Sequence, residues 1–198
     1  TVSSATDGAS STATGGSLAA ETVIVLGEVN GNIKAEGVAQ TLIKSDKRMT
    51  YLEAQALIDG DEEEAKAHAK TEPKYTPQLI ATLKEMNALA RAIQGRRQRQ
   101  GMISLELPEV VLLFDEHGRV IDAEREDDAF THTLIEMFMV EANEAAARLF
   151  NDLKIPMIRR VHADPDAHGL KDLRTFARVA GFNIPAKPSR KELQWLLD

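Results

Sequence analysis

The chain has 198 residues, of which 43% are hydrophobic and 28% are charged, and its formal net charge is -7. This composition is typical of a soluble globular protein, and no apolar run approaches the roughly 18–20 residues that a membrane span needs. The absence of cysteine excludes disulfides and thiolate metal sites, and it is compatible with the cytoplasmic location that we expect. The acidic balance argues against a protein that binds nucleic acid through overall charge alone.

The first residues differ in composition from the rest of the chain. Residues 1–20 are almost entirely Ser, Thr, Ala and Gly, and such a stretch cannot bury enough surface to offset its ordering entropy. We therefore expect a flexible segment over residues 1–20 and a folded region over residues 21–198. The start at Thr1 and the helical pattern that runs to Asp198 suggest that this region is the central part of a larger domain.

A hairpin and a capped helix are predicted next. Thr22–Leu26 and Ile33–Ile43 have strand character, and the turn signal Asn30-Gly31 between them predicts a β-hairpin. Thr50 and Glu53 have the spacing of a capping box, in which the two side chains satisfy free amides at a helix start. The helix should end at Gly60. The acidic run that follows, as far as Pro73, is expected to be a solvated linker with some helix.

Three further helices and a final truncated one are predicted by apolar periodicity and by capping residues. Pro77 is tolerated in the first turn of the first helix, and Gly101 ends it. Gly181 closes the third, and Ser189 and Glu192 form a second capping box. The expected ranges are 77–100, 127–153, 166–180 and 190–198.

Three segments between these helices have strand character. The first is interrupted by Pro108, and Asp115–Gly118 forms a plausible turn from it into the second. The third is a short strand after Pro156. The expected ranges are Ile103–Phe114, Arg119–Ala123 and Met157–Val161.

Four motifs, in this order and spacing, resemble the ribonuclease II / ribonuclease R catalytic domain (RNB domain), a family of 3′-5′ exoribonucleases. They are the passage Ile43–Tyr51, the basic helix end Arg96–Ser104, the helix from Glu136 to Asn143, and Arg160-Val-His162. The resemblance covers residues 21–198. It implies a mixed α/β (α+β) fold, with helices packed on a small mixed or antiparallel sheet, that is an incomplete catalytic domain.

The resemblance also implies a hydrolase that degrades single-stranded RNA to nucleoside 5′-monophosphates with Mg²⁺. The aspartate motif D-x-x-x-x-x-D-x-D-D that binds the metal in this family, and a downstream Thr-Ser-Pro-Ile-Arg-Arg-type segment, are not present in the sequence. We therefore predict no catalytic residue, no metal ligand and no bound Mg²⁺ in this chain, although the parent enzyme would use Mg²⁺. The expected partners are single-stranded RNA and the remaining portions of the catalytic domain, but neither DNA nor a membrane.

Eight residues are predicted to contact RNA. Glu136 and Asn143 lie two helical turns apart and share one helix face. Cations that track the RNA backbone are expected among the arginines. Leu105 stands where the family usually has a phenylalanine that stacks on the terminal base, and this departure weakens the expected grip on that base. The full set is Glu136, Asn143, Arg96, Arg97, Arg99, Leu105, Arg160 and His162.

Each of these residues also has an ordinary structural interpretation. Glu136 and Asn143 fit a solvated polar stripe, and the arginines at the end of the long helix complement its dipole. Leu105 fits a core strand, and Arg160 and His162 fit one face of a strand. A second hypothesis for the whole chain follows from these interpretations, namely a non-catalytic RNA-binding or scaffold module derived from the same family.

Overall fold

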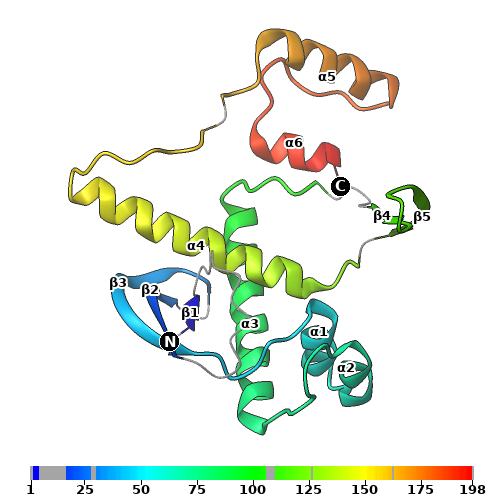
Figure 1. Ribbon diagram of the computed structural model, residues 1–198. Helices are drawn as coiled ribbons and strands as arrows, with labels where there is room; N and C mark the ends of the chain where they lie inside the picture. The colour runs from blue at the N-terminus through cyan, green and yellow to red at the C-terminus, as the bar shows by residue number, and fades with distance from the viewer. Residues whose placement is uncertain are drawn as a thin grey trace. The chain divides into compact units, whose positions relative to one another are not determined.

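The computed structural model divides the chain into two compact units, which Figure 1 shows with their labelled elements. Unit 1 comprises residues 1–96 and 127–157, and unit 2 comprises residues 97–126 and 158–198. Helices and antiparallel sheets occur in the chain, so the predicted mixed α/β class is confirmed. The structure describes residues 2–4, 17–27, 30–105, 110–125, 127–161 and 163–197.

Unit 1 combines an antiparallel sheet, in the order β1-β2-β3, with helices. The predicted hairpin is confirmed, because β2 and β3 pair in antiparallel register from Ser17↔Lys44 onward. The described elements of this unit are β1 (Val2–Ser4), β2 (Ser17–Gly27), β3 (Ile33–Lys44), α1 (Tyr51–Asp59), α2 (Glu62–His68), α3 (Pro77–Arg99, whose last three residues belong to unit 2) and α4 (Phe130–Asp152).

Two parts of the first twenty residues are described, and both lie in strands. Val2–Ser4 pairs with β2, and Ser17–Ala20 belongs to β2 itself. A sheet can include small polar residues because its ladder is made by backbone amides and carbonyls. Residues 5–16 lie outside the described residues, so the expectation of flexibility is not tested there.

The first helix begins and ends where the sequence predicts. The Thr50 side chain accepts a hydrogen bond from the Glu53 amide at 3.1 Å, and the Glu53 carboxylate accepts one from the Thr50 amide at 3.2 Å. Gly60 adopts φ +92° at the C-cap, a left-handed conformation that favours glycine. The acidic run, predicted as a solvated linker with some helix, begins with the helix α2, which Asp61 caps by accepting a hydrogen bond from the Glu64 amide.

Glu53 is also the centre of a buried polar cluster. Its side chain has no exposed surface, and its carboxylate lies 3.2 Å from the Lys47 ammonium and accepts a 3.0 Å hydrogen bond from the Tyr75 hydroxyl. Burial and the bond to Glu53 raise the pKa of Tyr75 to about 12. Lys47 also donates to the Glu72 carbonyl at 2.7 Å. The cluster therefore joins α1 to the segments before it and before α3.

These helices pack around an apolar core. Leu57 and Leu83 are buried in a cluster with Ala56 and Ala65, and Met49, Tyr75 and Leu79 are among the partly buried residues that pack on it. The hairpin turn approaches α3 closely, because a Cβ at Gly31 would lie 2.5 Å from the Ala92 carbonyl oxygen. Only glycine fits there, since Gly31 also has φ +82°.

Unit 2 contains a hairpin and two short helices. β4 (Val110–Phe114) and β5 (Val120–Arg125) are antiparallel. The predicted turn between them is confirmed, because the Asp115 carboxylate accepts hydrogen bonds from the His117 and Arg119 amides. The helices are α5 (Ala167–Val179) and α6 (Arg190–Leu197), and both begin close to their predicted starts. Asp166 caps α5, and the predicted capping residue Ser189 caps α6.

Of the predicted strand Ile103–Phe114, Val110–Phe114 is confirmed as β4, whereas its beginning and the predicted strand Met157–Val161 are not strands. Met157–Val161 has no regular secondary structure, and Ile158 and Val161 are strongly exposed. No described strand pairs with this segment, and the Ile158 and Val161 side chains remain exposed to solvent. Met102–Leu105 is irregular as well, because the Gln194 side chain bonds the Ser104 backbone in place of a neighbouring strand.

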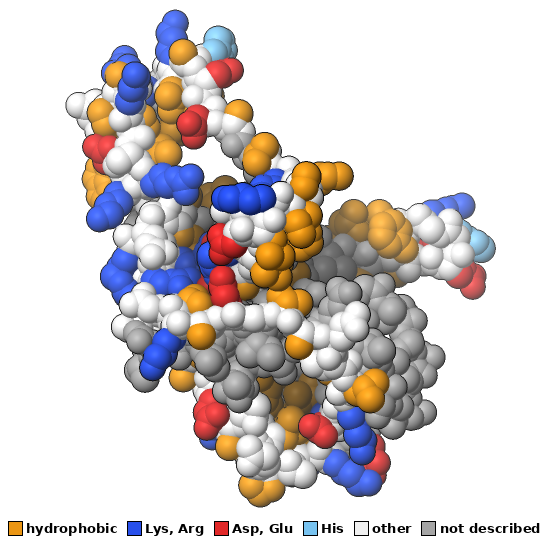
Figure 2. All heavy atoms as spheres, turned by 90° about the vertical axis from the view of Figure 1, so that its left-hand side faces the viewer, with side chains coloured by type: hydrophobic (Ala, Val, Ile, Leu, Met, Phe, Trp, Pro, Cys, Tyr) orange, Lys and Arg blue, Asp and Glu red, His pale blue; other side chains and the backbone are white. Residues whose placement is uncertain are grey.

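None of the helices described is long and apolar enough to cross a membrane. Several apolar side chains are nevertheless exposed, among them Leu42 of β3, Phe114 of β4 and Phe176 of α5. On the face that Figure 2 shows, such side chains lie among Lys, Arg, Asp and Glu side chains.

The buried cluster makes a prediction about stability. Replacing Glu53 with Ala would leave Lys47 without its carboxylate partner, and we expect the free energy of unfolding to fall by about 3 kcal/mol. Urea denaturation followed by circular dichroism measures this loss. The control is Glu62→Ala, at an exposed position of α2, which should change stability by less than about 0.5 kcal/mol. Equal effects of both substitutions would contradict a structural role for the cluster.

Candidate functional site

Two of the three predicted RNA-contacting residues of unit 1, Glu136 and Asn143, lie on the exposed side of α4, and the third, Arg96, lies on α3. Met137, Phe138 and Ala142 are buried, whereas Glu136 and Asn143 are exposed. Because the two polar residues are seven apart, they lie on one face, as predicted. Two apolar side chains on this helix, Ile135 and Met139, are also exposed. The resulting surface has two polar positions, with Met139 between them along the helix and Ile135 beside Glu136.

Arg96 fixes this helix to α3. The residue is only 8% exposed, and its Nη2 atom donates to Oε1 of the buried Glu141 on α4. Further along the two helices, the Arg91 guanidinium lies 3.8 Å from the centre of the Phe130 ring. These two contacts hold α4 across α3, so the side that bears Glu136 and Asn143 is turned away from the core.

This burial separates Arg96 from the other two predicted arginines of the helix end. Arg97 is half-buried and Arg99 is exposed, and both belong to unit 2. Because Arg96 is buried against Glu141, its guanidinium presents little surface to a phosphate in solvent. Arg96 is therefore a structural residue in this structure.

The remaining predicted residues lie in unit 2, except that His162 falls outside the described residues. Leu105 is 60% exposed and lies in an irregular segment, so its interpretation as a core strand residue is wrong. Arg160 is exposed in a segment without secondary structure, and its predicted place on a strand face is wrong too. Both side chains are nevertheless accessible to a ligand.

The arginine of α4, Arg148, ties this helix to the hairpin. Arg148 donates from Nε and Nη2 to the two carboxylate oxygens of Glu36 on β3, at 2.7 and 2.5 Å. This forked geometry suits a guanidinium and a carboxylate. The hydrogen bond lowers the pKa of Glu36 and raises that of Arg148. Sequence periodicity could not show this contact, because it joins residues distant in the chain.

The residues described do not fit a magnesium site. Within this part of the chain, no three His, Asp or Glu side chains gather in a way that could hold a metal ion. Asp61–Glu64, the longest acidic run, caps and begins α2.

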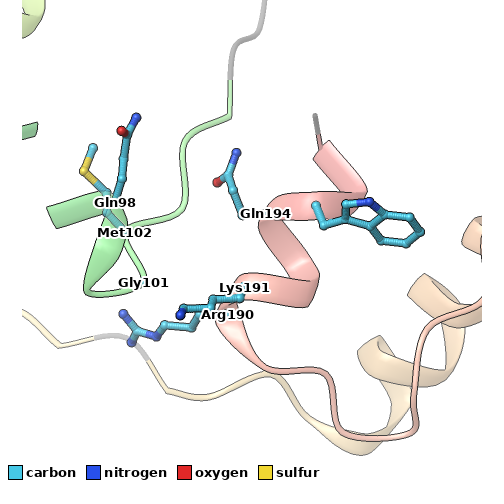
Figure 3. A pocket seen from close by; sticks show the side chains of 7 residues that line it. Gln98, Gly101, Met102, Arg190, Lys191 and Gln194 are labelled. Carbon is cyan, nitrogen blue, oxygen red and sulfur yellow. The ribbon is translucent and has the colours of Figure 1, made fainter. Parts of the chain in front are cut away.

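Sequence reasoning missed a pocket in unit 2. It has a volume of about 410 Å³ and lies between the end of α3 and α6 (Figure 3). The capping box at Ser189 and Glu192 predicted the helix that lines it, but no spacing in the sequence shows that this helix meets Gly101. The lining residues are Gln98, Gly101, Met102, Arg190, Lys191, Gln194 and Trp195.

Comparison with known proteins identifies relatives over nearly the whole chain. The RNB domain family matches residues 4–197. Ribonuclease R of Aquifex aeolicus is 32% identical over 82% of this chain and 22% of its own length, and Ribonuclease R of Escherichia coli is 27% identical over 80% and 19%. The chain thus spans about a fifth of the length of these relatives.

Solved structures show a similar fold. RNase R of Mycoplasma genitalium in complex with ribose-methylated single-stranded RNA has a TM-score of 0.79 and 23% identity, covering 91% of this chain and 27% of that one. The same enzyme in complex with double-stranded RNA has a TM-score of 0.71 and 24% identity, covering 89% and 31%. At these identities, the likeness shows the fold alone.

The different burial of the arginines can be tested by substitution. Arg96→Ala leaves the buried Glu141 carboxylate without its guanidinium, and we expect a loss of about 3–5 kcal/mol in the free energy of unfolding. Arg99→Ala, at an exposed position one turn on, should change it by less than about 0.5 kcal/mol. Denaturant midpoints compare the two variants. A small effect of Arg96→Ala would show that the buried pair does not hold α3 to α4.

Proposed function

Because the chain belongs to the RNB domain family, we propose that it forms part of the RNA-contacting wall of a 3′-5′ exoribonuclease. The parent enzyme would hydrolyse single-stranded RNA to nucleoside 5′-monophosphates in the cytoplasm. The observation that carries the proposal is the exposed face of α4 with Glu136 and Asn143, on a helix whose opposite side is buried. A rigid helix with an accessible polar face can present hydrogen-bonding groups to a strand at fixed spacing.

The chemical character of this face suits contacts to bases and sugars. The Asn143 amide both donates and accepts hydrogen bonds, and the Glu136 carboxylate accepts them from exocyclic amino groups and 2′-hydroxyls. Met139 and Ile135 add apolar surface beside them. Neither polar side chain would neutralise a phosphate, so contacts to the RNA backbone would come from the cations of unit 2.

Arg97, Arg99 and Arg160 are our candidates for those backbone contacts, and Leu105 is a candidate for apolar contact with the terminal nucleotide. Arg99, Leu105 and Arg160 are exposed. Leucine offers no ring on which a base can stack, and such stacking is worth ~1–3 kcal/mol per base. We therefore expect the terminal base to be gripped less firmly than by an aromatic side chain.

The metal-dependent step would belong to another part of the parent protein. In such an enzyme, Mg²⁺ would activate the attacking water and stabilise the leaving oxygen. The residues described here would position the strand for that step.

A non-catalytic module is the second candidate function. The exposed leucine at position 105 and the net charge of -7 favour it. A module of this kind would bind RNA or a protein through the same surface without ever meeting a metal centre. If adding a separately expressed segment that contains the family's aspartate motif creates nuclease activity, the enzyme is favoured over the module.

RNA binding by α4 gives a quantitative prediction. The double variant Glu136→Ala/Asn143→Ala should bind a single-stranded oligonucleotide about tenfold more weakly, since it lacks two hydrogen-bonding side chains that contribute about 1 kcal/mol or less each. The salt dependence of binding should not change, because neither residue neutralises a phosphate. Filter binding at several salt concentrations measures both quantities. Glu62→Gln, at an exposed position of α2, is the control; unchanged affinity of the double variant would remove α4 from the RNA surface.

We also predict that the isolated polypeptide does not degrade RNA. With Mg²⁺ and poly(A), chromatography should detect no nucleoside 5′-monophosphates. The sequence lacks the family's aspartate motif, and the described residues include no group of side chains that could hold a metal ion. A full-length ribonuclease R preparation serves as the positive control. Robust release of nucleotides that a chelator abolishes would overturn this prediction.

A further inference from the structure

The pocket of unit 2 has a wall that is fixed by hydrogen bonds. The Gln194 side-chain oxygen accepts a hydrogen bond from the Ser104 amide at 2.6 Å, and its nitrogen donates to the Ser104 carbonyl at 3.3 Å. This pair of bonds joins α6 to the segment that follows α3. The pocket therefore lies between two elements that are hydrogen-bonded to each other. The Gln194 side-chain amide, which joins them, already has the Ser104 backbone as its hydrogen-bond partner.

Arg190 is positioned by a close approach to Gly101. A Cβ at Gly101 would lie 3.4 Å from Cβ of Arg190 and 3.5 Å from its Cδ, so the arginine stem packs directly on the glycine. Gly101 also has φ +95°, which disfavours any side chain there. Figure 3 shows Arg190 extending from α6 toward this turn.

The charges at this pocket are positive. Arg190 and Lys191 line it, no carboxylate does, and within the described part of the chain neither cation makes an ion pair. The neighbouring carboxylate of Glu192 accepts a 2.7 Å hydrogen bond from the Ser189 amide, and this bond lowers its pKa. Glu192 is thus engaged at the helix cap and does not neutralise the two cations.

The other lining residues add hydrogen-bonding and apolar surface. Gln98 contributes an exposed amide, and Met102 and Trp195 contribute apolar atoms. Trp195 is 57% exposed, and its ring meets Phe182 edge to face, with 5.6 Å between centroids. A ligand that matches this lining has an anionic group next to a flat apolar one.

We propose that this pocket binds one nucleotide of an RNA strand, with the phosphate on Arg190 and Lys191 and the base against Met102 and Trp195. The inference rests on the proposed function, since it takes the ligand to be RNA. It adds a binding site on α6, a helix that holds none of the residues that the sequence predicts to contact RNA. Cations suit the phosphate, and the amide of Gln98 can donate to a phosphate or a base.

The test uses the fact that Trp195 is the single tryptophan of the chain. The tryptophan emission should change when a short unlabelled oligoadenylate is added. This change should saturate at the same RNA concentration as the fluorescence anisotropy of a fluorescein-labelled copy of the oligonucleotide. Adenosine 5′-monophosphate should cause the same change at higher concentration. Inorganic phosphate should compete with it. An emission change with phosphate alone and none with nucleotides would overturn the base contact.

Charge-removing variants connect this signal to the pocket. Arg190→Gln/Lys191→Gln should weaken oligoadenylate binding at least about fivefold, and should lower the slope of log affinity against log salt by about 1.4 for two lost phosphate contacts. The matched control is Lys171→Gln/Arg178→Gln, which removes the same charge from exposed positions of α5. Circular dichroism checks that both variants are folded.

The outcomes separate this inference from the proposed function. If the wild-type chain binds RNA but the pocket variant behaves like the α5 control and Trp195 emission stays constant, the pocket proposal alone fails. If no RNA binds under any salt condition, both proposals fail. A loss of affinity and of salt slope that is confined to the pocket variant supports both.

Discussion

The buried pair of Arg96 and Glu141 is the contact on which the exposed face of α4 depends. Two charges removed from water are costly unless they meet each other, and a lone survivor costs about 3–5 kcal/mol. This cost allows few alternative packings of α3 against α4. Because Glu141 faces inward, two residues of α4 must face outward. They are Glu136, five positions before Glu141, and Asn143, two positions after it.

The N-terminal hairpin is attached to the same helix at a second point. Arg148 grips Glu36 of β3 through two hydrogen bonds, and Gly31 lets the hairpin turn reach the backbone of α3. Helix α4 is thereby held near its C-terminal end as well as at its centre. A surface meant to present side chains to a long flexible ligand benefits from such support, because a rigid site loses less entropy on binding.

The accuracy of the sequence predictions follows the range of the interactions involved. The N-terminal starts of α1, α5 and α6 were predictable because each depends on a short-range hydrogen bond. The side chains of Thr50, Asp166 and Ser189 each accept a hydrogen bond from the backbone amide three residues later. The strand over Met157–Val161 was wrong because β-branched residues make a strand only when a partner pairs with them. The burial of Arg96, three residues before the exposed Arg99, could not be predicted either, because its partner Glu141 is distant in the sequence.

Two kinds of contact with RNA would follow from this arrangement, and they obey different physics. The face of α4 carries no cation, so its contribution should be insensitive to salt, whereas Arg190 and Lys191 would act by releasing counterions. A chain with a net charge of -7 repels RNA at long range. Local cations held against a preformed wall can still bind the backbone at short range, because at physiological salt the screening length is only about 8 Å. Affinity in such a protein would depend on a few placed residues more than on overall charge.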